Sequence, residues 1–150
     1  MQVLLVLLAV VVGGASALQG ATNGVLAGRL GLSSAVLINA LVVALGASTL
    51  WLVLPRGPSV SAAAIPWFLF LGGVYGLIII AGAAFAFPRL GAGPTTALMI
   101  AAQLCAALIL DHLGLPSGKI AVTPVRVLGA CFLITGALLV LWPKLASLRT

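Results

Sequence analysis

Five stretches of predominantly apolar residues follow one another along this chain of 150 residues. A helix rises about 1.5 Å per residue, so about 20 such residues cross the hydrocarbon core of a bilayer. Composition agrees with this, because 63% of the residues are hydrophobic and 5% are charged, whereas soluble domains carry about a quarter charged residues. The sequence predicts an all-α integral membrane protein with one five-helix transmembrane domain over 1–150, with helices at about 3–27, 33–54, 66–87, 95–113 and 123–142. No internal repeat is evident.

The first stretch also has one feature of a signal peptide. Ala-Ser-Ala at 15–17 resembles a cleavage site after an apolar region. However, no Lys or Arg precedes that region, and the apolar pattern continues past the site to Ala27. A membrane-spanning helix is therefore favoured over a cleaved segment.

The positive residues stand apart from one another, although the net charge is +6. Without a basic stripe, nucleic-acid binding is not indicated. Five spans place the termini on opposite sides, which divides the positive residues into Arg56, Lys119 and Arg126 on the side of the N-terminus and Arg29, Arg89, Lys144 and Arg149 on the other. This near balance gives the positive-inside rule little to act on.

Two consequences remain open. The chain can insert either way round, so that an antiparallel homodimer, or a pair with a paralogous chain, forms in the lipid bilayer; alternatively, a weak local signal fixes one orientation. The antiparallel geometry is the one that inverted repeats give many transporters within a single chain.

Small residues mark two spans. Such residues let helix backbones approach closely in lipid. The predicted helix-packing positions are Ser16, Gly20, Gly24 and Gly28, which recur every four residues, together with Gly72 and Gly76.

Uncharged polar residues interrupt the same apolar stretches. Gln19 and Asn23 lie one turn apart, Tyr75 lies in the third stretch, and Gln103 lies near the middle of the fourth. An amide in hydrocarbon must bond a neighbouring helix or face a polar cavity. The first alternative makes these residues structural, and the second makes them the lining of a site for a small-molecule substrate.

The only acidic residue, Asp111, precedes the only histidine, His112. Adjacent helical residues do not face each other, and neither a nucleophile constellation nor metal-ligand spacing accompanies them. The sequence therefore predicts no enzyme activity, no cofactor and no metal site. Asp111 is either a proton- or cation-coupling site, the default hypothesis for an intramembrane acid, or half of a structural ion pair with Arg126.

Three segments together resemble the YdcZ-like family, a five-helix branch of the drug/metabolite transporter (DMT) superfamily. The matching residues are Gly14, Gln19, Asn23 and Gly31; then Gly72, Gly73, Gly76, Pro88, Arg89, Leu90 and Gly91; then Gln103, Asp111, His112 and Gly114. The resemblance covers nearly the whole chain. It implies a multi-pass protein of the bacterial inner (cytoplasmic) membrane that works as an antiparallel pair with dual topology and transports small metabolites or toxic organic compounds.

The resemblance does not extend to every mechanism in the superfamily. The small multidrug resistance branch couples protons to cationic substrates through a glutamate in its first helix, and this chain has no acid there. The expected function is transport of a small molecule by alternating access in an antiparallel dimer, with substrate, direction and coupling ion left open. The alternative is a non-transporting membrane subunit whose amides and glycines only hold helices together.

Overall fold

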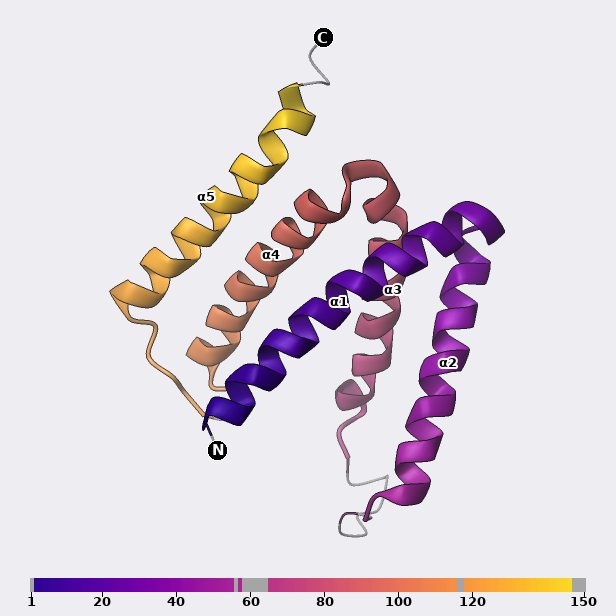
Figure 1. Cartoon of the computed structure of the whole chain (residues 1–150). Coiled ribbons are helices and arrows are strands. Elements are labelled where there is room, and N and C mark those ends of the chain that lie inside the picture. The colour runs from indigo at the N-terminus through magenta and orange to yellow at the C-terminus, as the bar shows by residue number, and fades with distance from the viewer. Residues whose placement is uncertain (1, 56, 58–64, 116–117, 147–150) are drawn as a thin grey trace. The chain divides into compact units, whose positions relative to one another are not determined.

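The computed structural model of the chain describes residues 2–55, 57, 65–115 and 118–146 (Figure 1). These residues form α1 (Gln2–Leu30), α2 (Leu32–Val53), the short 3-10 helix η2 (Trp67–Leu71), α3 (Gly72–Leu90), α4 (Ala92–Leu113) and α5 (Pro124–Ala146). With η2 and α3 taken together, five helical segments are long and apolar enough to cross a membrane. The predicted all-α fold class with five membrane-spanning helices is confirmed. Arg56 and Arg149, two of the charges weighed above, lie outside the described residues.

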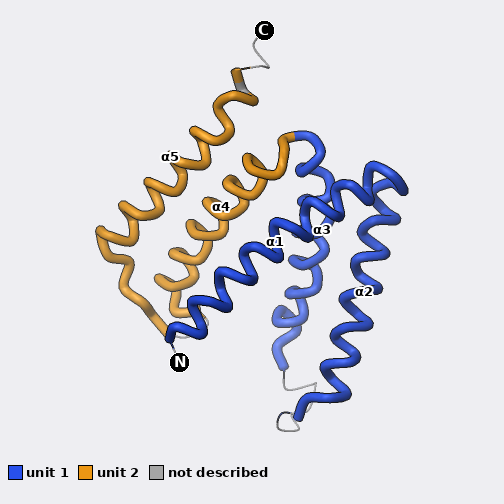
Figure 2. The backbone as a smooth tube through the Cα atoms, viewed as in Figure 1, with its two compact units in different colours: residues 1–89 blue, residues 90–150 orange. Residues whose placement is uncertain are grey.

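The chain divides into two compact units, residues 1–89 and residues 90–150 (Figure 2). In the first unit α1 packs against α2, and in the second α4 packs against α5. Most large apolar side chains remain exposed, while the buried apolar residues are mainly alanines. Hydrocarbon gives no hydrophobic drive between helices, so contacts form where small side chains let backbones approach.

Single glycines join α1 to α2 and α3 to α4, and we call Gly31 and Gly91 the glycine turns. Their φ, ψ angles are nearly the same, 86° and 156° at Gly31 and 94° and 158° at Gly91. Only glycine adopts this region without strain. Each glycine carbonyl accepts a hydrogen bond from the backbone N–H four residues later, at 3.1 Å from Ala35 and 3.2 Å from Thr95.

The second glycine turn is shorter than the proline-flanked turn expected from the sequence. α3 does not end at Phe87 but continues through Pro88 to Leu90, and Gly91 alone separates it from α4. A proline in a helix removes the bond to the carbonyl four residues earlier. Arg89 adds a bond beside that gap, because its Nη1 donates to the Phe85 carbonyl at 2.6 Å.

The two glycine turns also repeat in sequence and burial. Both follow Arg-Leu, giving Arg-Leu-Gly at 29–31 and at 89–91. Positions sixty residues apart are buried alike, namely Asn23 and Ala83, Gly24 and Ala84, and Ala35 and Thr95. The Arg-Leu-Gly tripeptide is present in the sequence, but the repeat was missed because the rest of it lies in backbone conformation and burial, with few other identical residues.

Within the first unit, the end of α3 packs on two of the six predicted packing positions. A methyl group added to Gly20 would lie 2.5 Å from Phe87 Cζ, and one added to Gly24 would lie 3.1 Å from Pro88 Cδ. The other positions make no such approach in the described part of the chain. An added methyl at Gly28, Gly72 or Gly76 meets nothing within 4 Å, and Ser16 is exposed.

This contact predicts opposite outcomes for two glycines of α1, Gly20 and Gly28. Gly20→Ala should lower the free energy of unfolding by about 1–3 kcal/mol, the usual cost of overpacking, because the buried Phe87 ring must move. Gly28→Ala, the matched control, should be neutral or slightly stabilising, since it removes a helix glycine in open space. Unfolding of the purified protein in detergent measures both. Phe87→Leu should restore stability in the Gly20→Ala background; an equal loss from both alanines would contradict the packing account.

Candidate functional site

An amide pair joins α1 and α2. Asn39 Nδ2 donates a hydrogen bond to Asn23 Oδ1 at 3.2 Å. Both residues lie eight positions from Gly31, about 12 Å along each helix from the turn and inside the spans. Asn23 is 6% exposed. Asn23 thus has the interhelical bond that the structural alternative requires.

Sequence reasoning missed Asn39. The signal was available, because Asn39 is the only amide side chain in the second apolar stretch and lies as far after Gly31 as Asn23 lies before it. Its Oδ1 is buried and has no hydrogen-bond partner among the described residues. A buried, unsatisfied acceptor costs about 1–3 kcal/mol, so this oxygen can accept a further hydrogen bond from a water, a neighbouring helix or a ligand.

Three other polar residues proposed from the sequence as cavity lining take no part in this amide pair. Gln19 and Gln103 are exposed, and Tyr75 is 59% exposed. No hydrogen bond joins their side chains to any other residue in the described part of the chain. Gln103 belongs to the second unit, and Gln19 and Tyr75 to the first. Each is therefore an exposed polar side chain without a hydrogen-bond partner among the described residues, on a helix long and apolar enough to span a membrane.

Thr95 is a second buried polar group without a partner. It lies in the first turn of α4, is 3% exposed, and its Oγ1 makes no hydrogen bond to a described residue. Its counterpart after the first glycine turn is Ala35, which has no such group. The hydroxyl is thus not required by the geometry of the turn.

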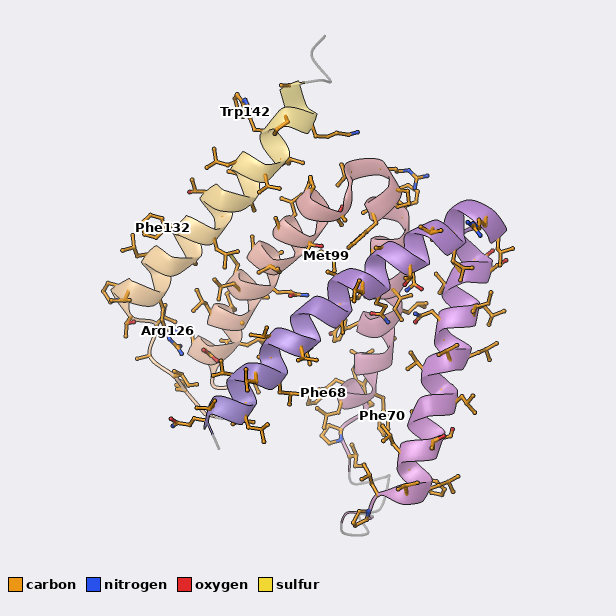
Figure 3. All side chains as sticks on the ribbon, in the orientation of Figure 1. Phe68, Phe70, Met99, Arg126, Phe132 and Trp142 are labelled. Carbon is orange, nitrogen blue, oxygen red and sulfur yellow. The ribbon has the colours of Figure 1, made fainter. Side chains whose placement is uncertain are left out.

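An ion pair connects α4 and α5. Arg126 Nη1 donates to Asp111 Oδ2 at 2.9 Å, with side chains 41% and 28% exposed. Arg126 extends from the first turn of α5, near the end of α4 (Figure 3). The Asp111 carbonyl also accepts hydrogen bonds from the N–H groups of Gly114 and Ile120. The last turn of α4 is therefore tied both to the following loop and to α5.

Because of the helix dipole, each charge of this ion pair is unfavourable at the end of its own helix. Asp111 is negative at the carboxyl end of α4, and Arg126 is positive at the amino end of α5, which are unfavourable placements. The Asp111 carboxylate is instead favourable beside the amino end of α5, and the Arg126 guanidinium beside the carboxyl end of α4. The two charges also attract each other. No cluster of three or more His, Cys, Asp or Glu residues that could hold a metal occurs among the described residues.

These observations define a class, a multi-pass α-helical membrane protein whose spans carry uncharged polar groups and one ion pair near their ends. A family model described as "Putative inner membrane exporter, YdcZ" matches residues 4–139. The chain therefore belongs to the YdcZ family, as the resemblance predicted, and is a multi-pass protein of the inner membrane. The family's description, that of a membrane exporter, is consistent with a transporter. No curated protein and no solved structure matches the chain.

The ion pair allows a test between its two predicted roles. Asp111→Asn or Arg126→Gln should each lower the free energy of unfolding by about 1 kcal/mol or less, as expected for a partly exposed pair. The exchange Asp111→Arg with Arg126→Asp should restore stability, since it keeps the attraction and improves both helix-end placements. Unfolding in detergent measures stability, and liposome uptake measures function. A structural pair regains both on exchange; stability regained without transport would instead assign Asp111 a coupling role.

Proposed function

We propose that this chain exports a small molecule across the inner membrane by alternating access, as an antiparallel pair of copies. Membership of an exporter family supports transport. The observation that carries the site is the set of exposed polar side chains without partners in the described part of the chain, Gln19, Tyr75 and Gln103. In hydrocarbon such groups are unfavourable unless a cavity, a ligand or another helix satisfies them.

The depth of these residues supports a shared site. Gln103 lies near the middle of α4, and Gln19 and Tyr75 each lie within about 5 Å, along the axis, of the middle of their spans. Transporters bind substrates near this depth, at the interface between repeats. A second copy in the opposite orientation would supply the facing half of the site.

The chemistry of the lining indicates the kind of substrate. Amide and phenol groups offer hydrogen-bond donors and acceptors but no charge. The acid nearest to Gln103 is Asp111, eight residues away and paired with Arg126. A neutral solute with several hydrogen-bonding groups therefore fits this lining at least as well as a cation.

The runner-up is a non-transporting subunit, in which the same side chains bond a different membrane chain. Such a subunit would copurify with that chain and, when isolated, would gain no stability from any small molecule. A transporter would be stabilised by its substrate, because a ligand that binds the folded state raises its apparent stability. A thermal-shift screen with a metabolite panel separates the two.

Gln103 provides the direct functional test. The purified protein is reconstituted in liposomes, and uptake of the panel is followed. Gln103→Ala should reduce transport about tenfold, the effect of losing about 1.4 kcal/mol of hydrogen bonding to the substrate, while leaving dimers intact. Thr135→Ala is the matched control, since the Thr135 hydroxyl already donates within its own helix, to the Cys131 carbonyl at 2.8 Å. Full activity in Gln103→Ala would remove this residue from the site.

Added charge tests the antiparallel arrangement. The wild-type chain should insert in both orientations, as measured by accessibility of tags at both termini in intact cells. Ser33→Lys adds a cation on the side of Arg29, and Ala121→Lys adds one on the side of Arg126; both positions are exposed. Each should bias insertion in the opposite sense to the other. Transport should fall in either variant alone and return on coexpression. A single orientation of the wild type would rule out the antiparallel homodimer.

A further inference from the structure

The two Arg-Leu-Gly segments differ in what their arginines contact. Arg89 is engaged within its own helix, because it donates to the Phe85 carbonyl and its guanidinium lies 3.5 Å from the centre of the Phe85 ring. Arg29 is exposed and makes no hydrogen bond or ion pair with a described residue. It lies in the last turn of α1, where the span reaches the headgroup region.

A hollow of about 360 Å³ lies on α1 beside Arg29. Its described lining comes from α1 alone and consists of Ala21, Thr22, Val25, Leu26 and Arg29. The Thr22 hydroxyl is directed to carbonyls of its own helix, so the wall is apolar apart from the guanidinium. We call this the α1 hollow.

Within the first unit, the α1 hollow lies on the face of the helix opposite its packed residues. At 3.6 residues per turn, its centre is roughly 180° around the axis from Gly20, Asn23 and Gly24, which form the buried face. Helical side chains also lean toward the N-terminus, so Arg29 reaches back over Val25 and Leu26. The arrangement is a strip of apolar wall with one cation at its interfacial end.

We propose that the α1 hollow binds an anionic phospholipid, with an acyl chain along Ala21 and Val25 and the headgroup phosphate on Arg29. Guanidinium matches phosphate in charge and in bidentate geometry. A zwitterionic headgroup fits less well, because its ammonium needs an anion. The only acidic side chain of the chain is Asp111, which is already paired with Arg126.

A second copy of the chain fits the α1 hollow less well than an anionic phospholipid does. Each copy has one acidic side chain, and it is already held in an ion pair, so a second copy offers no free acidic side chain to Arg29. A phospholipid supplies both missing components, the apolar chain and the negative charge. This proposal does not depend on transport.

Native mass spectrometry of the full-length protein in mild detergent tests the proposal. The probes are phosphatidylglycerol and phosphatidylethanolamine with identical acyl chains. The wild type should retain phosphatidylglycerol about fivefold better, the usual gain from one basic side chain near an anionic surface. Arg29→Gln should abolish this preference, and Arg29→Lys should keep part of it. Arg89→Gln, with the same local sequence and membrane side, should leave it unchanged.

Filling the hollow tests the acyl-chain contact separately. Ala21→Trp should lower retention of both lipids while leaving their ratio unchanged, and it keeps the test decisive if Arg29→Gln fails to fold. Glycerol phosphate, which lacks acyl chains, should not displace the lipid. Equal retention of both lipids by the wild type, equal loss of preference in Arg29→Gln and Arg89→Gln, or displacement by glycerol phosphate would overturn the proposal.

Discussion

The hydrocarbon core of a bilayer offers no hydrogen-bond partner, so each polar group within a span must find its partner in the protein, in water or in a ligand. Backbone groups are satisfied by forming helices. Several hydroxyls are satisfied in the same way, since those of Thr22, Ser48, Thr49 and Thr135 donate to carbonyls in the preceding turn. Amides of Asn and Gln make no such bond here. The one partner seen among the described residues lies on another helix, since Asn39 bonds Asn23 across α1 and α2, and the remaining amides are therefore candidates for contacts with a ligand or a second chain.

The fold was largely predictable because length and hydropathy are enough to define membrane spans. What they do not define is the connection between spans. The prolines at 88 and 94 suggested a long turn, yet backbone conformation at Gly91 sets its position. A proline near the end of a helix loses one bond, whereas a residue at φ 94° and ψ 158° must be glycine. The Arg-Leu-Gly repeat becomes visible only when these two glycines are compared.

The candidate site was predictable only in part. The sequence indicated that Asn23 needs a partner and contained Asn39 as the one amide of the next span, but their meeting depends on α2 beginning directly after Gly31. Equal spacing from a glycine turn then places the two amides opposite each other. The partner of Gln103 could not be predicted for a different reason. Its amide is exposed and has no hydrogen-bond partner among the described residues, and one sequence does not contain the ligand or second copy that we propose as its partner.

The geometry of an antiparallel pair separates the roles of Gln103 and Asp111. If the two-fold axis lies in the membrane plane at mid-depth, only residues near that depth can meet their own copies. Gln103 meets this condition, being near the middle of α4. Asp111 lies about 12 Å further along the helix, so the two copies of Asp111 would be about 24 Å apart across the bilayer. In the antiparallel pair that we propose, a single symmetric pocket would therefore use both Gln103 side chains, whereas each Asp111 would remain with the Arg126 of its own chain.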